Sequence, residues 1–161
     1  MKNLKMLIAF LLLAFSFAVL AEKKVWYHGC FEADGSTKKT TKTTVKPLEE
    51  NKITKFTFAF EDGKSGSAYA QFPMFTDGDF TTFEIEIKGD GGKYFFEVWM
   101  EGDKGWILQK QIIMLSDDKW HKFPIKLVDL KSKQAKYLRI LFKNNENPEK
   151  GTILLKFPKY L

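Results

Sequence analysis

The chain has 161 residues, a net charge of +6 at neutral pH, one cysteine and an aromatic content of 16%. One cysteine cannot form an internal disulfide, so the fold must depend on a hydrophobic core, which sixteen phenylalanines can supply. Nearly all the positive charge is lysine, with Arg139 as the single arginine, and the lysines alternate with acids. Proteins that read nucleic acids usually carry arginine clusters on a basic face, so we expect no nucleic-acid partner.

Residues 1–21 have the three parts of a secretory signal peptide. Lys2 and Lys5 give the positive start, residues 6–20 form an apolar run, and Val19 and Ala21 suit a cleavage site. The run is shorter than the about 20 apolar residues that a membrane span needs. We therefore expect a secreted or periplasmic protein with no membrane span after cleavage, the alternative being an uncleaved N-terminal anchor.

Cleavage after residue 21 would leave one domain, residues 22–161, with its net charge lowered from +6 to +4 by loss of the two signal lysines. A short apolar piece at 25–31 precedes a stretch rich in threonine and lysine at 34–46, which we expect to form a loop and an exposed edge strand. From Ile53 onward, short segments alternate between apolar and polar residues. These expected strands cover residues 53–61, 67–72, 82–88, 94–101, 106–114, 120–127, 137–143 and 152–157. Such segments, separated by Gly, Asp and Asn turns, predict an all-β protein with an antiparallel β-sandwich.

Three segments carry a resemblance to a known type of domain. Residues 83–98 (FEIEIKGDGGKYFFEV) resemble the strand, Lys-Gly-Asp-Gly turn and strand of galactose-binding-like jelly rolls. Residues 116–127 resemble the next element of these domains, and residues 151–157 resemble their closing strand. Over roughly residues 56–161 the chain is thus similar to carbohydrate-binding modules and to CIA30-type domains. The resemblance implies a non-catalytic module that binds a polysaccharide or oligosaccharide and uses no cofactor.

Domains of this type often hold a structural calcium between acids of an opening Asp-Phe-Glu and of the closing strand. Phe31 and Glu32 keep part of the opening, but the closing strand here reads Ile153-Leu154-Leu155-Lys156. Leucine and lysine do not ligate calcium, which prefers oxygen ligands, so we expect no metal site.

The resemblance also implies that the ligand lies across a concave sheet face built from the strands at 67–72, 94–101, 106–114 and 137–143. Aromatic rings can stack on a pyranose, while amides, carboxylates and a guanidinium can bond its hydroxyls. The residues opposite the core register, and hence the candidate ligand-binding residues, are Tyr69, Gln71, Glu97, Trp99, Gln109, Gln111, Tyr137 and Arg139. Alternatively, Trp99 could be buried, and Glu97 and Arg139 could form a cross-strand ion pair. Trp120 is expected to be structural, at a point where a strand enters the core.

The sequence is also compatible with two other functions. A structural or partner-binding envelope protein, of flagellar-sheath or surface type, could use the same sandwich. A weak glycosidase could use Glu84 and Glu86, which project from one strand face roughly 7 Å apart, within the inverting range. Two glutamates alternating with isoleucines are more typical of a solvated face, and His28 and His121 lie near no serine, cysteine or metal-ligand cluster. We therefore expect no catalytic residues.

Overall fold

The computed structural model describes residues 25–32, 41–48, 52–60, 66–74 and 79–161. The predicted signal peptide, residues 1–21, lies outside the described residues, as does the first part of the stretch at 34–46. Within the described ranges no helix has the length and hydropathy that a membrane crossing requires.

Strands dominate the described residues, and two short 3-10 helices interrupt them. The elements are β1 (Tyr27–Glu32), β2 (Thr41–Leu48), β3 (Ile53–Phe60), β4 (Gly66–Pro73), β5 (Thr82–Lys88), β6 (Tyr94–Gly102), β7 (Gly105–Leu115), β8 (Trp120–Lys126), η1 (Ser132–Gln134), β9 (Tyr137–Lys143), η2 (Asn144–Glu146), β10 (Lys150–Lys156) and β11 (Lys159–Tyr160). A five-stranded sheet has the order β1-β4-β9-β6-β7, and a six-stranded sheet has the order β11-β5-β10-β3-β2 with β8 paired to β5. All pairings are antiparallel, which confirms the predicted β-sandwich.

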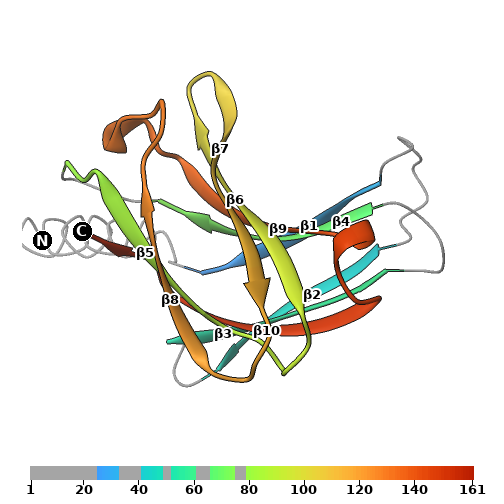
Figure 1. Cartoon of the computed structure of the whole chain (residues 1–161). Helices are drawn as coiled ribbons and strands as arrows, with labels where there is room; N and C mark the ends of the chain where they lie inside the picture. Colours follow the sequence, from blue (N-terminus) through green and yellow to red (C-terminus); the bar gives the residue numbers. More distant parts are fainter. Residues whose placement is uncertain (1–24, 33–40, 49–51, 61–65, 75–78) are drawn as a thin grey trace, which may run out of the picture.

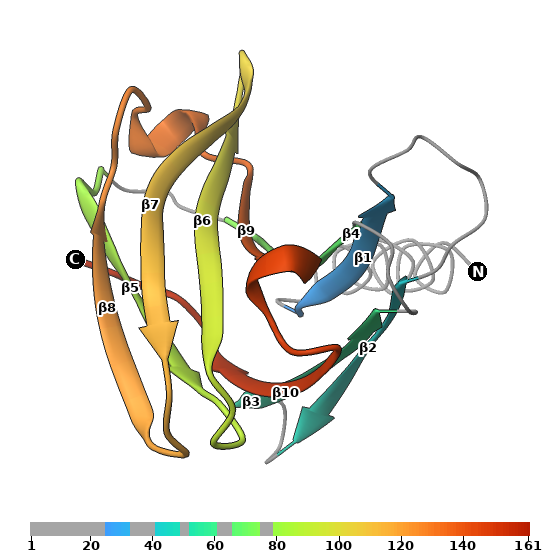
Figure 2. The ribbon, with the colours of Figure 1, turned by 45° about the vertical axis from the view of Figure 1, so that its right-hand side comes forward.

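The five-stranded sheet changes direction strongly across its width (Figures 1 and 2). β6 and β7 stand steeply in both views, whereas β1 and β4 lie side by side and run across the view of Figure 1, above β2. The two sheets meet where their edge strands β1 and β2 approach, and there the His28 Nδ1 and Thr43 Oγ1 atoms are hydrogen bonded at 2.8 Å. The strand twist therefore gives the outward face of the five-stranded sheet a curved surface.

Alternation along the strands fills the space between the sheets with aromatic rings. Phe142 of β9 is fully buried, and its ring centroid lies 5.3 Å from that of Phe58, 5.7 Å from Phe96 and 5.9 Å from Phe56. Ala68 and Ala70 of the adjacent β4 are also fully buried, and their small side chains leave room for these rings. The core thus joins both sheets through phenylalanines.

Most strands lie where the alternation predicts them, but some features of the two sheets were not predicted. The four strands expected to share the ligand sheet do share it, and β2 is an edge strand as expected. β1 joins that sheet as a fifth member, and β11 is an additional short strand that alternation did not reveal. Trp120 does not lie in the core, contrary to expectation: its indole is half-buried, with Lys156 Nζ 4.5 Å from the ring centroid.

Candidate functional site

The candidate site is the outward face of the five-stranded sheet. The strand register aligns one row of side chains across all five strands. From β1 to β7 the row contains Tyr27, Gln71, Arg139, Trp99 and Leu108. Residues directly opposite each other on neighbouring strands share a face, so this row forms a continuous band of rings, amide, guanidinium and apolar groups.

Arg139 occupies the centre of this face, on the middle strand β9. Its Cζ atom lies 3.7 Å from the ring centroid of Trp106, 4.2 Å from that of Tyr69 and 4.9 Å from that of Phe31. Its Nε and Nη2 groups donate to Gln71 Oε1 at 3.3 and 2.8 Å. We call Phe31, Tyr69 and Trp106 the Arg139 cage. Three rings and one amide hold the guanidinium in a defined orientation.

Gly29 makes this cage possible. The Tyr69 ring lies directly over Gly29, its register partner on β1. A Cβ atom at position 29 would come within 2.3 Å of the Tyr69 hydroxyl oxygen, closer than any non-bonded contact allows. The glycine lets the Tyr69 ring lie flat across β1, where it stacks on Phe31 at a centroid distance of 5.0 Å.

A second polar group on this face is centred on Glu97, whose side chain is nearly buried. Lys143 Nζ donates to Glu97 Oε1 at 2.5 Å, and Trp99 Nε1 donates to Glu97 Oε2 at 2.9 Å. The hydrogen bond to Glu97 raises the pKa of Lys143 above its usual value. The considered ion pair between Glu97 and Arg139 is therefore not formed, and the indole of Trp99 is half-buried and fixed by the carboxylate.

All the predicted ligand-binding residues except Gln109 lie on this outward face. Val98 pairs with Lys110 and Trp99 pairs with Leu108, so Gln109 is the extra residue of a β-bulge. Gln109 is 8% exposed; its Nε2 donates to Val128 O at 3.3 Å, and its Oε1 accepts from Val128 N at 2.7 Å. Gln109 therefore holds the segment after β8, and placing it on the face was wrong. The bulge resets the alternation along β7, and nothing in the sequence marks its position.

The remaining predicted residues differ in how close they lie to Arg139. Tyr69 and Gln71 contact it directly, while Tyr137 lies opposite Glu101, in the next row. Gln111 is exposed opposite Glu97.

Several other residues of the face were not predicted from the sequence. Phe31, Tyr27 and Leu108 are 46%, 49% and 39% exposed, and Trp106 contacts Arg139 directly. For β1 a signal existed, because Tyr27, Gly29 and Phe31 alternate with period two. For Trp106 and Leu108 the mixed polarity of β7 concealed which side faces outward.

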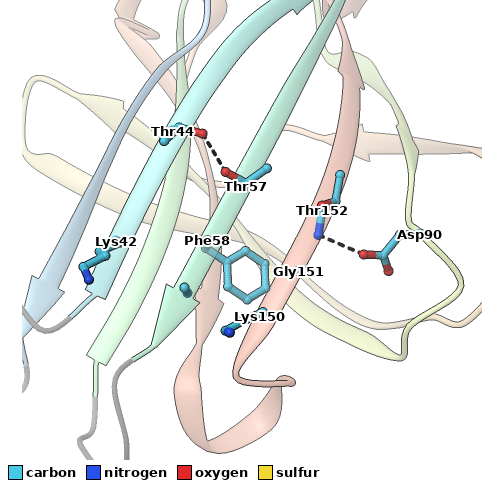
Figure 3. Close-up of a pocket in the computed structure, with 9 residues that line it drawn as sticks. Lys42, Thr44, Thr57, Phe58, Asp90, Lys150, Gly151 and Thr152 are labelled. Atoms are coloured by element: carbon cyan, nitrogen blue, oxygen red, sulfur yellow. Dashed lines mark hydrogen bonds between the residues drawn. The ribbon is translucent and has the colours of Figure 1, made fainter.

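A separate hollow of about 340 Å³ lies on the outer face of the six-stranded sheet (Figure 3). Thr44 and Thr57 point into it and bond to each other through their hydroxyls at 2.5 Å. Asp90 Oδ2 accepts from the Thr152 amide at 3.1 Å, and Asp90 Oδ1 accepts from the Tyr94 hydroxyl at 2.6 Å. These polar groups satisfy one another, so the hollow offers a ligand little beyond exposed lysines.

Another hollow, of about 670 Å³, lies between the segments at 79–81 and 126–134. The carboxylate of Asp79 accepts from Ser132 Oγ at 3.4 Å and pairs with Lys133 Nζ at 3.4 Å. Its polar groups are also engaged with each other.

The glutamates weighed for a glycosidase lie on the outer face of the six-stranded sheet. Glu86 is 4% exposed and accepts hydrogen bonds from Lys156 at 2.6 Å and from Lys159. The hydrogen bond from Lys156, followed by that from Lys159, lowers the pKa of Glu86 from 4.5 to about 2. A carboxylate that stays ionised in this way cannot donate a proton as a general acid at neutral pH. Glu86 acts instead as the centre of an ion-pair cluster.

Replacing Glu86 with glutamine is expected to reduce the pH dependence of stability. Because its folded pKa lies below its ordinary value, Glu86 stabilises the fold above about pH 4.5 and loses this effect as the pH falls toward 2. Lys159 is 56% exposed and screened by water, so we expect a loss of only about 1–2 kcal/mol at neutral pH. The difference between wild type and Glu86→Gln in urea unfolding should shrink steadily between pH 5 and 2.

Glu84→Gln is the matched control, because Glu84 projects from the same strand face and its Lys122 contact is 3.8 Å long. A Glu86→Gln protein whose stability tracks the wild type at every pH would show that the cluster contributes nothing.

Among the described residues, no group of three or more His, Cys, Asp and Glu side chains could hold a metal ion.

No protein-family model and no curated protein matches the chain. Solved structures are similar in fold. One represents carbohydrate-binding modules of the β-sandwich superfamily with promiscuous specificity: TM-score 0.56, 14% identity, covering 84% of this chain and 56% of that one. Another is the family 11 carbohydrate-binding module of a cellulosomal cellulase of Clostridium thermocellum: TM-score 0.54, 12% identity, covering 88% and 90%.

A third structure is a family 11 module from the same organism in complex with a β-1,3-1,4-mixed-linked tetrasaccharide. It also has a TM-score of 0.54 and 12% identity, with 88% of this chain and 91% of that chain covered. At these identities the likeness shows the fold. The chain therefore has the jelly-roll sandwich that these carbohydrate-binding modules share.

Proposed function

We propose that this chain is an exported, non-catalytic carbohydrate-binding module that holds a polysaccharide on the outward face of its five-stranded sheet. The observation that carries the proposal is the row of Tyr27, Gln71, Arg139, Trp99 and Leu108, which crosses all five strands on one open face. An extended polysaccharide needs a long surface of this kind, with rings for its apolar faces and polar groups for its hydroxyls.

The likeness in fold supports this choice of ligand, because a family 11 module of the same sandwich type was solved with a bound tetrasaccharide. Export is supported by the signal-like residues 1–21. Binding by a few stacked rings on an open sheet should be of moderate strength, since the sugar hydroxyls must give up water.

Trp99→Ala tests the proposal. We expect titration calorimetry with a glycan that binds the wild type to show an affinity at least about 10-fold lower, because a half-buried indole near the centre of the face supplies much of the contact area. Trp99→Phe should keep most of the affinity, since it retains a ring and loses only the N–H bond to Glu97.

The matched control is Trp120→Ala, which removes a half-buried indole from the other sheet. It should leave glycan affinity unchanged. Wild-type protein that binds none of a broad panel of β-glucans, mannans, polyuronates and sulfated glycans would rule out the proposal.

A partner-binding role in the cell envelope is the second candidate, and one observation favours it. Tyr27 and Phe31 of the edge strand β1 expose nearly half of their surface on this face, and Leu108 is partly exposed at its opposite edge, on β7. Exposed apolar groups on one face suit a protein interface as well as a sugar. This candidate predicts a specific crosslinked envelope complex and no response to any glycan.

A further inference from the structure

Within the part of the chain that the structure describes, no acid forms an ion pair with Arg139. Trp106 and Tyr69 pack against the guanidinium, with ring centroids 3.7 and 4.2 Å from its Cζ atom. Among the described residues, no carboxylate oxygen lies within 4.0 Å of its nitrogens. The surface lysines, by contrast, form most of the ion pairs with acids. The only arginine of the chain is thus placed against rings rather than beside an acid.

The nearby acids do not supply the missing charge. Glu97 is committed to Lys143 and to the indole N–H of Trp99. Glu101 acts on Arg139 only through space. Burial lowers the pKa of Arg139, yet a guanidinium keeps its proton at any physiological pH. A charge that is partly removed from water without a partner costs free energy, and a bound anion would recover that cost.

The guanidinium also has free hydrogen-bonding capacity. Its Nε group and one N–H of Nη2 bond to Gln71 Oε1, and the other N–H groups have no acceptor among the described residues. The planar fork of an arginine matches two oxygens of one carboxylate, or of a sulfate ester. Because the cage and Gln71 already fix its orientation, little side-chain entropy would be lost when an anion binds.

We propose that the polysaccharide bound on this face is anionic and that one of its carboxylate or sulfate groups pairs with the guanidinium of Arg139. The inference rests on the proposed function and adds the chemical class of the ligand. A neutral glycan could accept the N–H groups through hydroxyls but would leave the charge unpaired. The net positive charge, +6 for the full chain and +4 without the two lysines of residues 1–21, favours the approach of such a ligand.

The test compares three pairs of glycans by titration calorimetry with the purified protein. The first pair is a polyuronate oligosaccharide and its carboxyl-reduced form, which keeps every linkage but replaces each carboxylate with a hydroxymethyl group. The second pair is a sulfated glucan and the unsulfated glucan, and the third is a neutral β-1,3-1,4-glucan and a neutral mannan. We expect at least about 10-fold tighter binding of one charged member over its neutral counterpart, and weakening as salt rises from about 50 to about 300 mM.

Arg139→Gln should abolish that preference, whereas Lys46→Gln, which removes one exposed charge from the other sheet, should preserve it. Arg139→Lys should retain only part of the preference for the charged glycan, since a lysine keeps the charge but lacks the planar pair of N–H donors. Equal binding of charged and neutral members, or a preference that Arg139→Gln leaves intact, would overturn the inference while the module still binds glycans. If the wild-type protein binds none of these six glycans, the proposed function itself is ruled out.

Discussion

Replacing Phe142 with alanine is expected to lower the free energy of unfolding by about 3–5 kcal/mol. The Phe142 side chain is fully buried, and its ring contacts Phe56, Phe58 and Phe96. These rings come from both sheets, so the cavity left by the substitution would lie in the contact between them. Because the surrounding strands cannot collapse into that space, the lost contacts add to the lost hydrophobic burial.

Urea unfolding followed by tryptophan fluorescence measures this loss. Phe95→Ala is the matched control, since Phe95 is the residue before Phe96 on β6 and is only half-buried. We expect the control to cost well below half as much. Equal losses at both positions would mean that the sandwich does not depend on its central aromatic cluster.

This core was predictable because alternation with period two is set by backbone geometry alone. In β9 the apolar residues Leu138, Ile140 and Phe142 recur at every second position, and this spacing alone assigns their side chains to the interior. The same pattern assigned Arg139 to the outward face correctly. For fold class, and for the side that a residue faces in a regular strand such as β9, local periodicity is sufficient.

Local periodicity does not predict which residues a side chain contacts, because these contacts depend on pairing between strands that are distant in the sequence. Tyr69 and Arg139 were predicted as separate sugar contacts, whereas the structure packs the Tyr69 ring against the guanidinium, which Trp106 also contacts. Gln109 was misplaced because a bulge shifts the phase along β7. Neither feature has a local signature, since both arise from how separate strands align with one another.

The cage changes what the face can do for a ligand. Part of the ring surface of Tyr69 and Trp106 already contacts a guanidinium, so these rings offer a sugar less stacking area than an open platform would. Trp99, held by Glu97, is the better stacking residue near the centre of the face. Stacking and charge recognition are thus divided between adjacent strands, with Trp99 on β6 and Arg139 on β9 as direct register partners.

Gly151→Ala is expected to destabilise the protein by about 1–3 kcal/mol, although alanine ordinarily suits a strand better than glycine. A Cβ atom at position 151 would lie 2.5 Å from Phe58 Cζ and 2.7 Å from Tyr94 Cε1. Figure 3 shows Phe58 beside Gly151 at the hollow on the six-stranded sheet. Neither ring can move away easily. The ring centroids of Phe58 and Phe142 lie 5.3 Å apart, and the Tyr94 hydroxyl donates to Asp90 Oδ1 at 2.6 Å.

The control is Thr152→Ala, one residue further along β10, where the side chain is half-buried and the backbone N–H bond to Asp90 is retained. It should change the free energy of unfolding by less than about 1 kcal/mol. The near-ultraviolet circular dichroism of Gly151→Ala should also change, because relieving the overlap requires the Phe58 or Tyr94 ring to rotate. An alanine variant as stable as the wild type, with an unchanged spectrum, would mean that β10 can move away from these rings. The contact of Gly151 with the rings of Phe58 and Tyr94 would then not determine how closely β10 approaches the aromatic core.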